Sequence, residues 1–184
     1  YLPDWHPWED YRESFAARAE LGGGVILTLT HPLDYMRWLF GDVTSLSAEA
    51  GAFSDLGIPV EDTTEITLRF ADRVLASVHL DYNQRPPRHQ MEIITTEGTI
   101  RWDHLQTHFE VWTAATGSWQ QHAIAPDFAR DDLFAAQMRH FLEVVKGTEA
   151  PRCTLDDGIW AQKLALAAHQ SVAEGRRIDL TAGG

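Results

Sequence analysis

The chain has 184 residues, of which 44% are hydrophobic, and a formal net charge of −12 at pH 7. This length fits one domain, or one domain with a small appendage, and a core that needs no disulfide or metal. An acidic chain repels phosphate backbones, so nucleic acid is not an expected partner. The single cysteine, Cys153, and the lack of a basic leader or an apolar run of about 18 residues predict a cytoplasmic protein without a membrane partner.

The N-terminal stretch DWHPWEDYR is rich in aromatic residues. Pro7 is expected to occupy the first position of a short helix, which runs into Ala16–Leu21 and ends at Gly22. The stretch also offers flat apolar faces and hydrogen-bond donors that suit a sugar: Trp5, Trp8, His6, Tyr11 and Arg12. The alternative is a terminal strap that packs on the rest of the fold.

The next stretch, GGGVILTLTHPLDYMRWLFG, places one histidine directly before a proline. Apolar residues at helical spacing predict a helix that ends at Gly41: Leu29, Leu33, Met36 and Phe40. Pro32 has no N–H, and its ring clashes with the carbonyl of Thr28. Either a helix is kinked here, or a new helix begins at Pro32 with His31 at its mouth.

His31 is therefore expected at a break in regular structure. Spacings of three and four place Thr28, Asp34 and Tyr35 near it. An imidazole with a hydroxyl and a carboxylate in reach can move a proton from an alcohol. The alternative is a half-buried structural histidine at a helix kink.

The middle of the chain alternates apolar and polar residues, which is typical of strands. The predicted strands are 43–53, 64–70, 74–82, 89–95, 99–103, 106–113 and 118–124. Their short links favour a large, open and mainly antiparallel sheet. Two helices follow, over 129–147 and from Thr154 to Gly175, with Asp157 completing an acidic capping box. The predicted fold class is α+β.

A second polar group surrounds a Pro-Pro turn in LDYNQRPPRHQ: Tyr82, Gln84, Arg85, Arg88 and His89. Planar and cationic groups at a strand end suit a polyol, carboxylate or phosphate ligand, whereas the alternative is a solvated turn. The chain contains no G-x-G-x-x-G, H-E-x-x-H, C-x-x-C or G-x-S-x-G motif. No dinucleotide site and no metal site are therefore predicted within this chain.

Several of these stretches together, YLPDWHPWEDYR, ELGGGVILTLTHPLDYMRWLFGDV and CTLDDGIWAQKLALAAHQS with the strands between, resemble the C-terminal domain of the Gfo/Idh/MocA family of oxidoreductases. The resemblance covers essentially the whole chain, 1–184. It implies a large antiparallel sheet with helices packed on one face and a homodimer or homotetramer formed through the other. It also implies a separate N-terminal Rossmann domain that binds NAD or NADP, with no cofactor bound to this chain itself.

The resemblance matches His31 to the family's catalytic histidine, and places the family's substrate-binding Asp at Thr28 or Leu27. The implied substrate-binding residues are Trp5, His6, Tyr11, Arg12, Thr28, Tyr82 and Arg85. The implied substrate is a sugar, inositol or sugar nucleotide, which reacts at a ring alcohol. The chain alone is expected to be inactive. The alternative is a non-catalytic ligand-binding or dimerisation module, which the missing Asp favours and the retained His31 and Arg85 disfavour.

Overall fold

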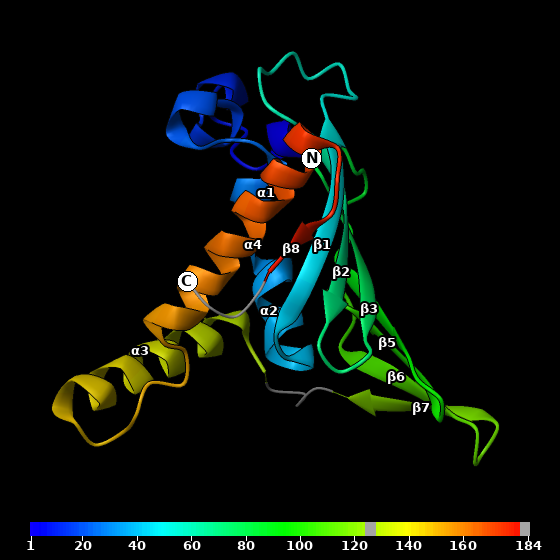
Figure 1. Cartoon of the computed structure of the whole chain (residues 1–184). Helices are drawn as coiled ribbons and strands as arrows, with labels where there is room; N and C mark the ends of the chain where they lie inside the picture. The colour runs from blue at the N-terminus through cyan, green and yellow to red at the C-terminus, as the bar shows by residue number, and fades with distance from the viewer. Residues whose placement is uncertain (124–127, 181–184) are drawn as a thin grey trace. The chain divides into compact units, whose positions relative to one another are not determined.

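A computed structural model describes residues 1–123 and 128–180 and divides the chain into two compact units (Figure 1). The first unit comprises Tyr1–Gln84 with Cys153–Gly184, and the second comprises Arg85–Arg152. Each contains one four-stranded sheet, with strand orders β3-β2-β1-β8 and β4-β5-β6-β7. The predicted α+β class with antiparallel strands is confirmed, but the strands form two sheets where one large sheet was expected. The division follows Gln84, where Pro86 and Pro87 have no N–H to donate to a ladder.

The first unit contains one sheet and three α-helices. Its elements are α1 (Val25–Thr28), α2 (His31–Phe40), β1 (Val43–Gly51), β2 (Thr63–Phe70), β3 (Leu75–Asp81), α4 (Leu155–Glu174) and β8 (Ile178–Asp179). The bounds of β1, β2 and β3 differ from the predicted strands by no more than two residues. The two-residue strand β8 was not predicted, because it is too short to show alternation.

The core of the first unit lies between one face of its sheet and the helices. The inward side chains are buried: Leu46, Ala48, Ile66, Leu68, Phe70, Val78 and Leu80. Helix α4 crosses this face and contributes Leu164, Ala165 and Ala168 to the core (Figure 1). The opposite face is exposed and polar, with Ser47, Glu65, Thr67, Ser77 and His79. This alternation is the pattern expected of an antiparallel sheet with one covered face.

The helix predicted from Pro7 is wrong. The N-terminal segment instead forms four short 3₁₀ helices, η1 (Leu2–Asp4), η2 (Tyr11–Glu13), η3 (Phe15–Ala17) and η4 (Ala19–Leu21). Tertiary contacts fix this path, because the Leu2 N–H donates to the carbonyl of Tyr82 and the Gly24 N–H donates to the carbonyl of Ala16, both at 2.9 Å. Gly22, with φ of 78°, ends η4 as predicted for the end of this segment.

Of the two geometries expected around Pro32, the structure shows the second. Helix α1 ends at Thr28, and α2 begins at His31 with Pro32 in its first turn. The carbonyl of Thr30 accepts hydrogen bonds from the Leu33 and Asp34 N–H groups. Leu33 is buried, and Gly41 ends the helix with φ of 84°. The apolar run therefore forms two short helices and no continuous one.

Helix α4 begins and ends as predicted. The Thr154 hydroxyl accepts from the Asp157 N–H, and the Asp157 carboxylate accepts from the Thr154 N–H at 2.8 Å. Gly175 terminates the helix in the left-handed region. Asp157 also forms a 2.9 Å ion pair with Arg37, which joins the start of α4 to α2. In the described part of the chain, no helix has the length and apolarity needed to span a bilayer.

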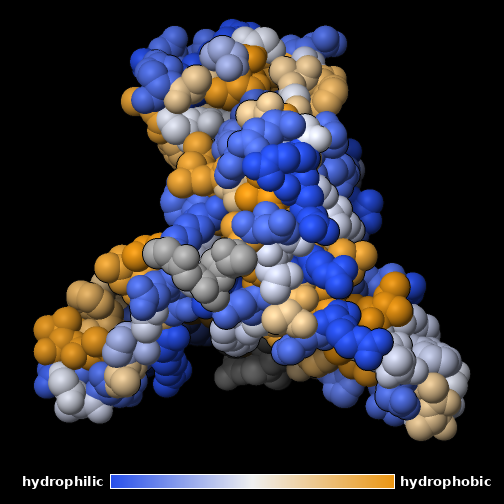
Figure 2. Space-filling view, viewed as in Figure 1, coloured by the Kyte–Doolittle hydropathy of each residue, from blue (hydrophilic) through white to orange (hydrophobic). Residues whose placement is uncertain are grey.

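The second unit contains β4 (Gln90–Ile94), β5 (Gly98–Asp103), β6 (His108–Thr113), β7 (Ser118–Ala123) and α3 (Arg130–Lys146). These match the predicted strands and helix, although Ile124 of the last predicted strand lies outside the described residues. None of the described residues of this unit, 85–123 and 128–152, is buried. The apolar stripe of α3 is more than half exposed at Leu133, Met138, Phe141 and Val145, and apolar side chains gather there in Figure 2.

Asp62 lies between the β1–β2 loop and β2, and its side chain is only 1% exposed. Its carboxylate accepts hydrogen bonds from the Phe53 N–H, the Ser54 N–H, the Ser54 hydroxyl and the Thr63 hydroxyl, at 2.5 to 3.1 Å. Burial by itself raises the pKa of Asp62, but these hydrogen bonds outweigh burial and lower the pKa below its ordinary 3.8. The charged form is therefore the form that holds the loop.

Asp62→Asn should lower the free energy of unfolding by about 1–3 kcal/mol, because the amide leaves buried donors unpaired. A carboxylate with a lowered folded-state pKa stabilises above its unfolded pKa and loses that contribution as pH falls through the folded value. The difference from wild type should therefore shrink below about pH 4, which urea unfolding at several pH values measures. Asp55→Asn, at an exposed position of the same loop, is the control. Equal stability of Asp62→Asn and Asp55→Asn at pH 7 would contradict the assignment of the Asp62 carboxylate as the group that holds the loop.

Gly24 requires the absence of a side chain. It has φ of 103°, and a Cβ there would lie 2.3 Å from Oε1 of Glu61. Gly24→Ala should therefore destabilise the protein by about 1–3 kcal/mol through backbone strain and displacement of Glu61. Gly158→Ala is the matched control, since Gly158 lies in α4 with open space around it and should gain about 0.5–1 kcal/mol. Thermal unfolding compares the two, and a neutral Gly24→Ala would refute the close approach.

Candidate functional site

The 3₁₀ helices of the N-terminal segment enclose a cavity of about 250 Å³ in the first unit. Its walls are formed by Leu2, Trp5, His6, Glu9, Tyr11, Ser14, Phe15 and Ala16. Aromatic and apolar surfaces dominate this lining, with a few polar groups among them, as is usual for small-molecule sites. Three predicted binding residues, Trp5, His6 and Tyr11, are thus brought together, and Glu9 joins them as a residue that the sequence did not single out.

Two contacts fix the aromatic walls. The Tyr11 hydroxyl donates to the carbonyl of Leu56 at 2.7 Å, so the loop held by Asp62 also holds Tyr11. The Trp5 ring meets the Tyr82 ring edge to face, with centroids 5.5 Å apart. Such edge contacts add about 0.5–1.5 kcal/mol beyond simple burial. The cavity is therefore built against residues that the core positions.

Tyr82 stands behind the cavity wall. Its side chain is fully buried, and its hydroxyl donates to the carbonyl of Ala16 at 3.3 Å. Burial raises the pKa of Tyr82 to about 12, and the charge of Glu61 adds to this rise, while the Thr28 hydroxyl acts in the opposite direction. Tyr82 therefore stays neutral at physiological pH and supports the wall, where the sequence predicted direct substrate contact.

A carboxylate that the sequence analysis missed lies beside α1. Glu61 accepts the Ile26 N–H at Oε1 (3.2 Å), and the same oxygen lies 3.6 Å from Nε2 of His169. Its backbone carbonyl accepts the Val25 N–H at 3.0 Å. Thr28 Oγ1 and His169 Nε2 are both buried and have no regular hydrogen bond within the described residues. Thr28 or Leu27 stands where the resemblance places the family's Asp, and Glu61 brings a carboxylate to the same short helix.

One feature of the sequence could have indicated that Glu61 accepts backbone hydrogen bonds. Glu61 and Asp62 stand directly before an alternating strand, where paired acids often accept hydrogen bonds from neighbouring N–H groups. What the sequence lacks is the partner, because α1 lies 35 residues earlier in the chain. The contact between Glu61 and Ile26 is therefore a product of the fold.

His31 lies at the mouth of α2 and is exposed. Within the described residues, no hydrogen bond or ion pair links it to Thr28, Asp34 or any other side chain, so the cluster expected from helical spacing does not form. The physical reason is the break at residues 29–30, which turns α2 away from the helical register of α1. This exposure leaves the imidazole open to a ligand.

The two predicted arginines do not line the cavity. Arg12 is exposed, lies 3.5 Å from Asp10 and stacks over the Tyr11 ring with its guanidinium carbon 5.0 Å from the ring centre. It therefore braces the outside of η2. Arg85 is exposed and begins the second unit.

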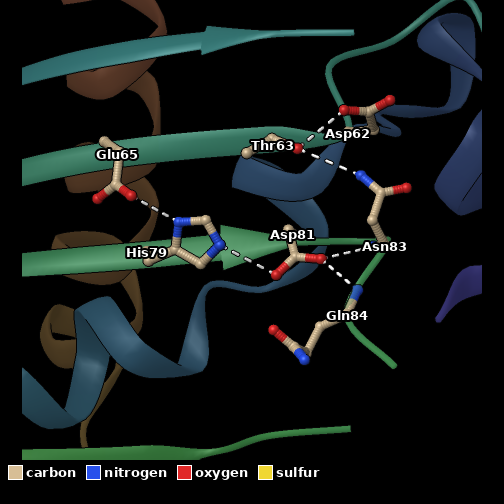
Figure 3. Close-up of polar contacts among 7 residues, drawn as sticks. All are labelled: Asp62, Thr63, Glu65, His79, Asp81, Asn83 and Gln84. Atoms are coloured by element: carbon tan, nitrogen blue, oxygen red, sulfur yellow. Dashed lines mark hydrogen bonds and ion pairs between the residues drawn. The ribbon is translucent and has the colours of Figure 1, made fainter. Parts of the chain in front are cut away.

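The segment after β3 is fixed by a polar network (Figure 3). Asp81 accepts the N–H groups of Asn83 and Gln84 at 2.6 and 2.5 Å, and its other oxygen lies 3.0 Å from His79 Nε2. Glu65 lies 2.6 Å from His79 Nδ1. Burial by itself lowers the pKa of His79, but the two carboxylates outweigh it and raise that pKa. This part of the predicted second cluster therefore stabilises the strand end.

The described residues contain no site for a dinucleotide or a metal ion. All of their strand pairs are antiparallel, so the βαβ arrangement that binds a pyrophosphate is absent from them. They also bring together no three side chains of His, Cys, Asp or Glu that could bind a metal.

Comparison with known proteins shows which proteins this chain is similar to. The chain is 26% identical to 1,5-anhydro-D-fructose reductase of Ensifer adhaerens over 171 residues, and to myo-inositol 2-dehydrogenase of Thermotoga maritima over 172. These matches cover 90% and 87% of this chain but 50% of each relative, so the chain spans about half the length of the relatives it matches.

Solved structures share the fold at low identity. The apo form of a levoglucosan dehydrogenase superposes with a TM-score of 0.84 at 17% identity, covering 98% of this chain and 57% of that one. Aldose-aldose oxidoreductase of Caulobacter crescentus, complexed with glycerol, gives 0.80 at 21% identity, covering 94% and 52%. The sequence model of the GFO/IDH/MocA C-terminal domain matches residues 2–101, which is more than half of the chain. The chain therefore belongs to the GFO/IDH/MocA family, as a C-terminal domain.

Proposed function

We propose that this chain is the substrate-binding domain of an NAD- or NADP-dependent oxidoreductase that acts on a ring alcohol of a sugar, inositol or sugar-nucleotide type of substrate. The observation that carries the proposal is the aromatic cavity of the first unit, which gathers Trp5, His6 and Tyr11. Flat aromatic faces suit the apolar faces of a sugar ring, and the polar groups suit its hydroxyls. The names of the relatives, a reductase of an anhydro sugar and a dehydrogenase of an inositol, support the same class of substrate.

His31 is the residue we assign to proton exchange with the alcohol. It is exposed at the start of α2, and a neutral imidazole can accept a hydroxyl proton at physiological pH. The nucleotide is assigned to an N-terminal Rossmann domain, because this chain spans about half of its relatives and its strand pairs are all antiparallel among the described residues. The single cysteine supports a cytoplasmic location.

We also propose that the protein is a homodimer or homotetramer, joined through the second sheet. The exposed face of the first sheet is polar apart from Leu75, so it offers little apolar surface for the association that the resemblance implies. In the second sheet, one face gathers apolar side chains that are only partly buried, with Phe109 37% exposed: Met91, Ile93, Ile100, Trp102, Phe109 and Val111. A second copy would remove this surface from water.

The assignment of His31 is tested in the full-length protein, with NAD or NADP and a panel of sugars and cyclitols. His31→Ala should lower kcat/KM by about 10²-fold or more, with cofactor affinity unchanged, because a general acid–base group contributes about that much. His104→Ala, which alters an exposed imidazole of the second unit, is the control. Unchanged turnover in His31→Ala would remove His31 from the site. No turnover by wild type on any substrate would favour the non-catalytic binding module.

The oligomer is tested by light scattering. Wild type should have the mass of two or four chains, and Ile100→Glu should reduce it to one, because a charge would be buried in an apolar interface. Thr99→Glu is the matched control, since its side chain points to the other face of the same strand. A monomeric wild type at high concentration, or equal masses for both variants, would count against this interface.

A further inference from the structure

A carboxylate and an imidazole meet in the wall of the N-terminal cavity. His6 and Glu9 both line it, and Nδ1 of His6 lies 2.7 Å from Oε1 of Glu9. Their side chains are 52% and 47% exposed, so both are open to a ligand. The His6 ring is also fixed from one side by the Trp8 ring, with centroids 5.3 Å apart. The imidazole therefore has a defined orientation before any ligand enters.

The contact with Glu9 decides which nitrogen of His6 is available. A neutral imidazole that donates its Nδ1–H to a carboxylate keeps a lone pair on Nε2. No described residue forms a hydrogen bond or an ion pair with Nε2 of His6. A substrate hydroxyl in the cavity could donate to that nitrogen.

His140 and Glu149 form a second histidine–glutamate pair with the same contact between Nδ1 and a carboxylate oxygen, but the other ring nitrogen of His140 is not free. His140 Nδ1 lies 2.7 Å from Glu149 Oε2, and its Nε2 accepts the Arg152 N–H at 3.2 Å. Both nitrogens of His140 are thus used within the fold, and no described cavity contains it. His6 differs in that its second nitrogen is left unused beside a cavity.

We propose that Glu9 is a positioning residue that holds His6 with Nε2 ready to accept a hydrogen bond from a hydroxyl of the substrate, and that the cavity admits a single sugar or cyclitol ring. This inference rests on the proposed function and refines its substrate class. A cavity of about 250 Å³ lies below the range of roughly 300–1,000 Å³ that larger ligands occupy. The cavity therefore has room for a monosaccharide or an inositol ring.

The test measures binding of myo-inositol, D-glucose and UDP-glucose to the full-length protein by isothermal titration calorimetry. Glu9→Gln should weaken binding of the small ring by about 10-fold, because its amide N–H can donate to Nδ1 and so move the ring proton to Nε2, and Glu9→Asp should restore part of the binding. His6→Phe, which keeps an aromatic ring beside Trp8, should weaken binding at least as much. The matched controls are Glu149→Gln and His140→Phe, which should bind like wild type.

A spectroscopic readout separates positioning from a general effect on folding. In wild type, ¹⁵N NMR should show His6 with its proton on Nδ1, and saturation with the small ring should shift the Nε2 resonance. Glu9→Gln should lose the tautomer preference while its urea unfolding midpoint stays at the wild-type value. A merely structural contact would change the midpoint and leave the ligand-dependent shift intact.

The outcomes are distinguishable. If wild type binds a small ring and Glu9→Gln binds it equally well, the role of Glu9 is refuted while the proposed function stands. If UDP-glucose binds more tightly than either small ring, the size argument is refuted. If wild type neither binds nor turns over any of the three, the proposed function fails, and the assignment of His6 and Glu9 fails with it.

Discussion

The fold of the first unit depends on two adjacent carboxylates, Glu61 and Asp62, placed directly before β2. Glu61 binds the backbone of α1 through both its carbonyl and its side chain, while Asp62 binds the backbone of the β1–β2 loop. That loop in turn accepts the hydroxyl of Tyr11 at Leu56. One dipeptide therefore fixes α1 on one side and a cavity wall on the other, and a Cβ on Gly24 would collide with the Glu61 side chain.

Elements whose residues contact local neighbours could be predicted from the sequence. Strands with period-two alternation, the capping box of Thr154 and the helix break at Pro32 all depend on residues close in the chain. The N-terminal 3₁₀ helices could not be predicted in this way, because their path is set by hydrogen bonds to Tyr82 and to the segment at Gly24. The division into two sheets was also hidden, since alternation shows that a segment is a strand but not which strand it pairs with.

The candidate site also depends on contacts between distant residues, which the sequence does not show. Trp5, His6 and Tyr11 were recognised from their side-chain chemistry, and the cavity unites them. Tyr82 was recognised by its place at a strand end, but the end of β3 turns its ring into the core. Glu61 and Glu9 were missed, because a single acid has no distinctive spacing until the fold shows what it faces. Residue type thus predicts what a side chain can do, whereas the fold decides whether it faces a ligand.

The two proposals give the imidazoles of His31 and His6 different tasks. His31 is exposed, which suits a group that meets its substrate only when another domain completes the site. His6 is oriented by Glu9 and Trp8 within a preformed cavity, which suits recognition of a hydroxyl before the reaction. Preorganisation lowers the entropy lost on binding, so in these proposals His6 would contribute chiefly to affinity and His31 to the rate. Loss of affinity in one variant and of turnover in the other is the pattern that this division of labour requires.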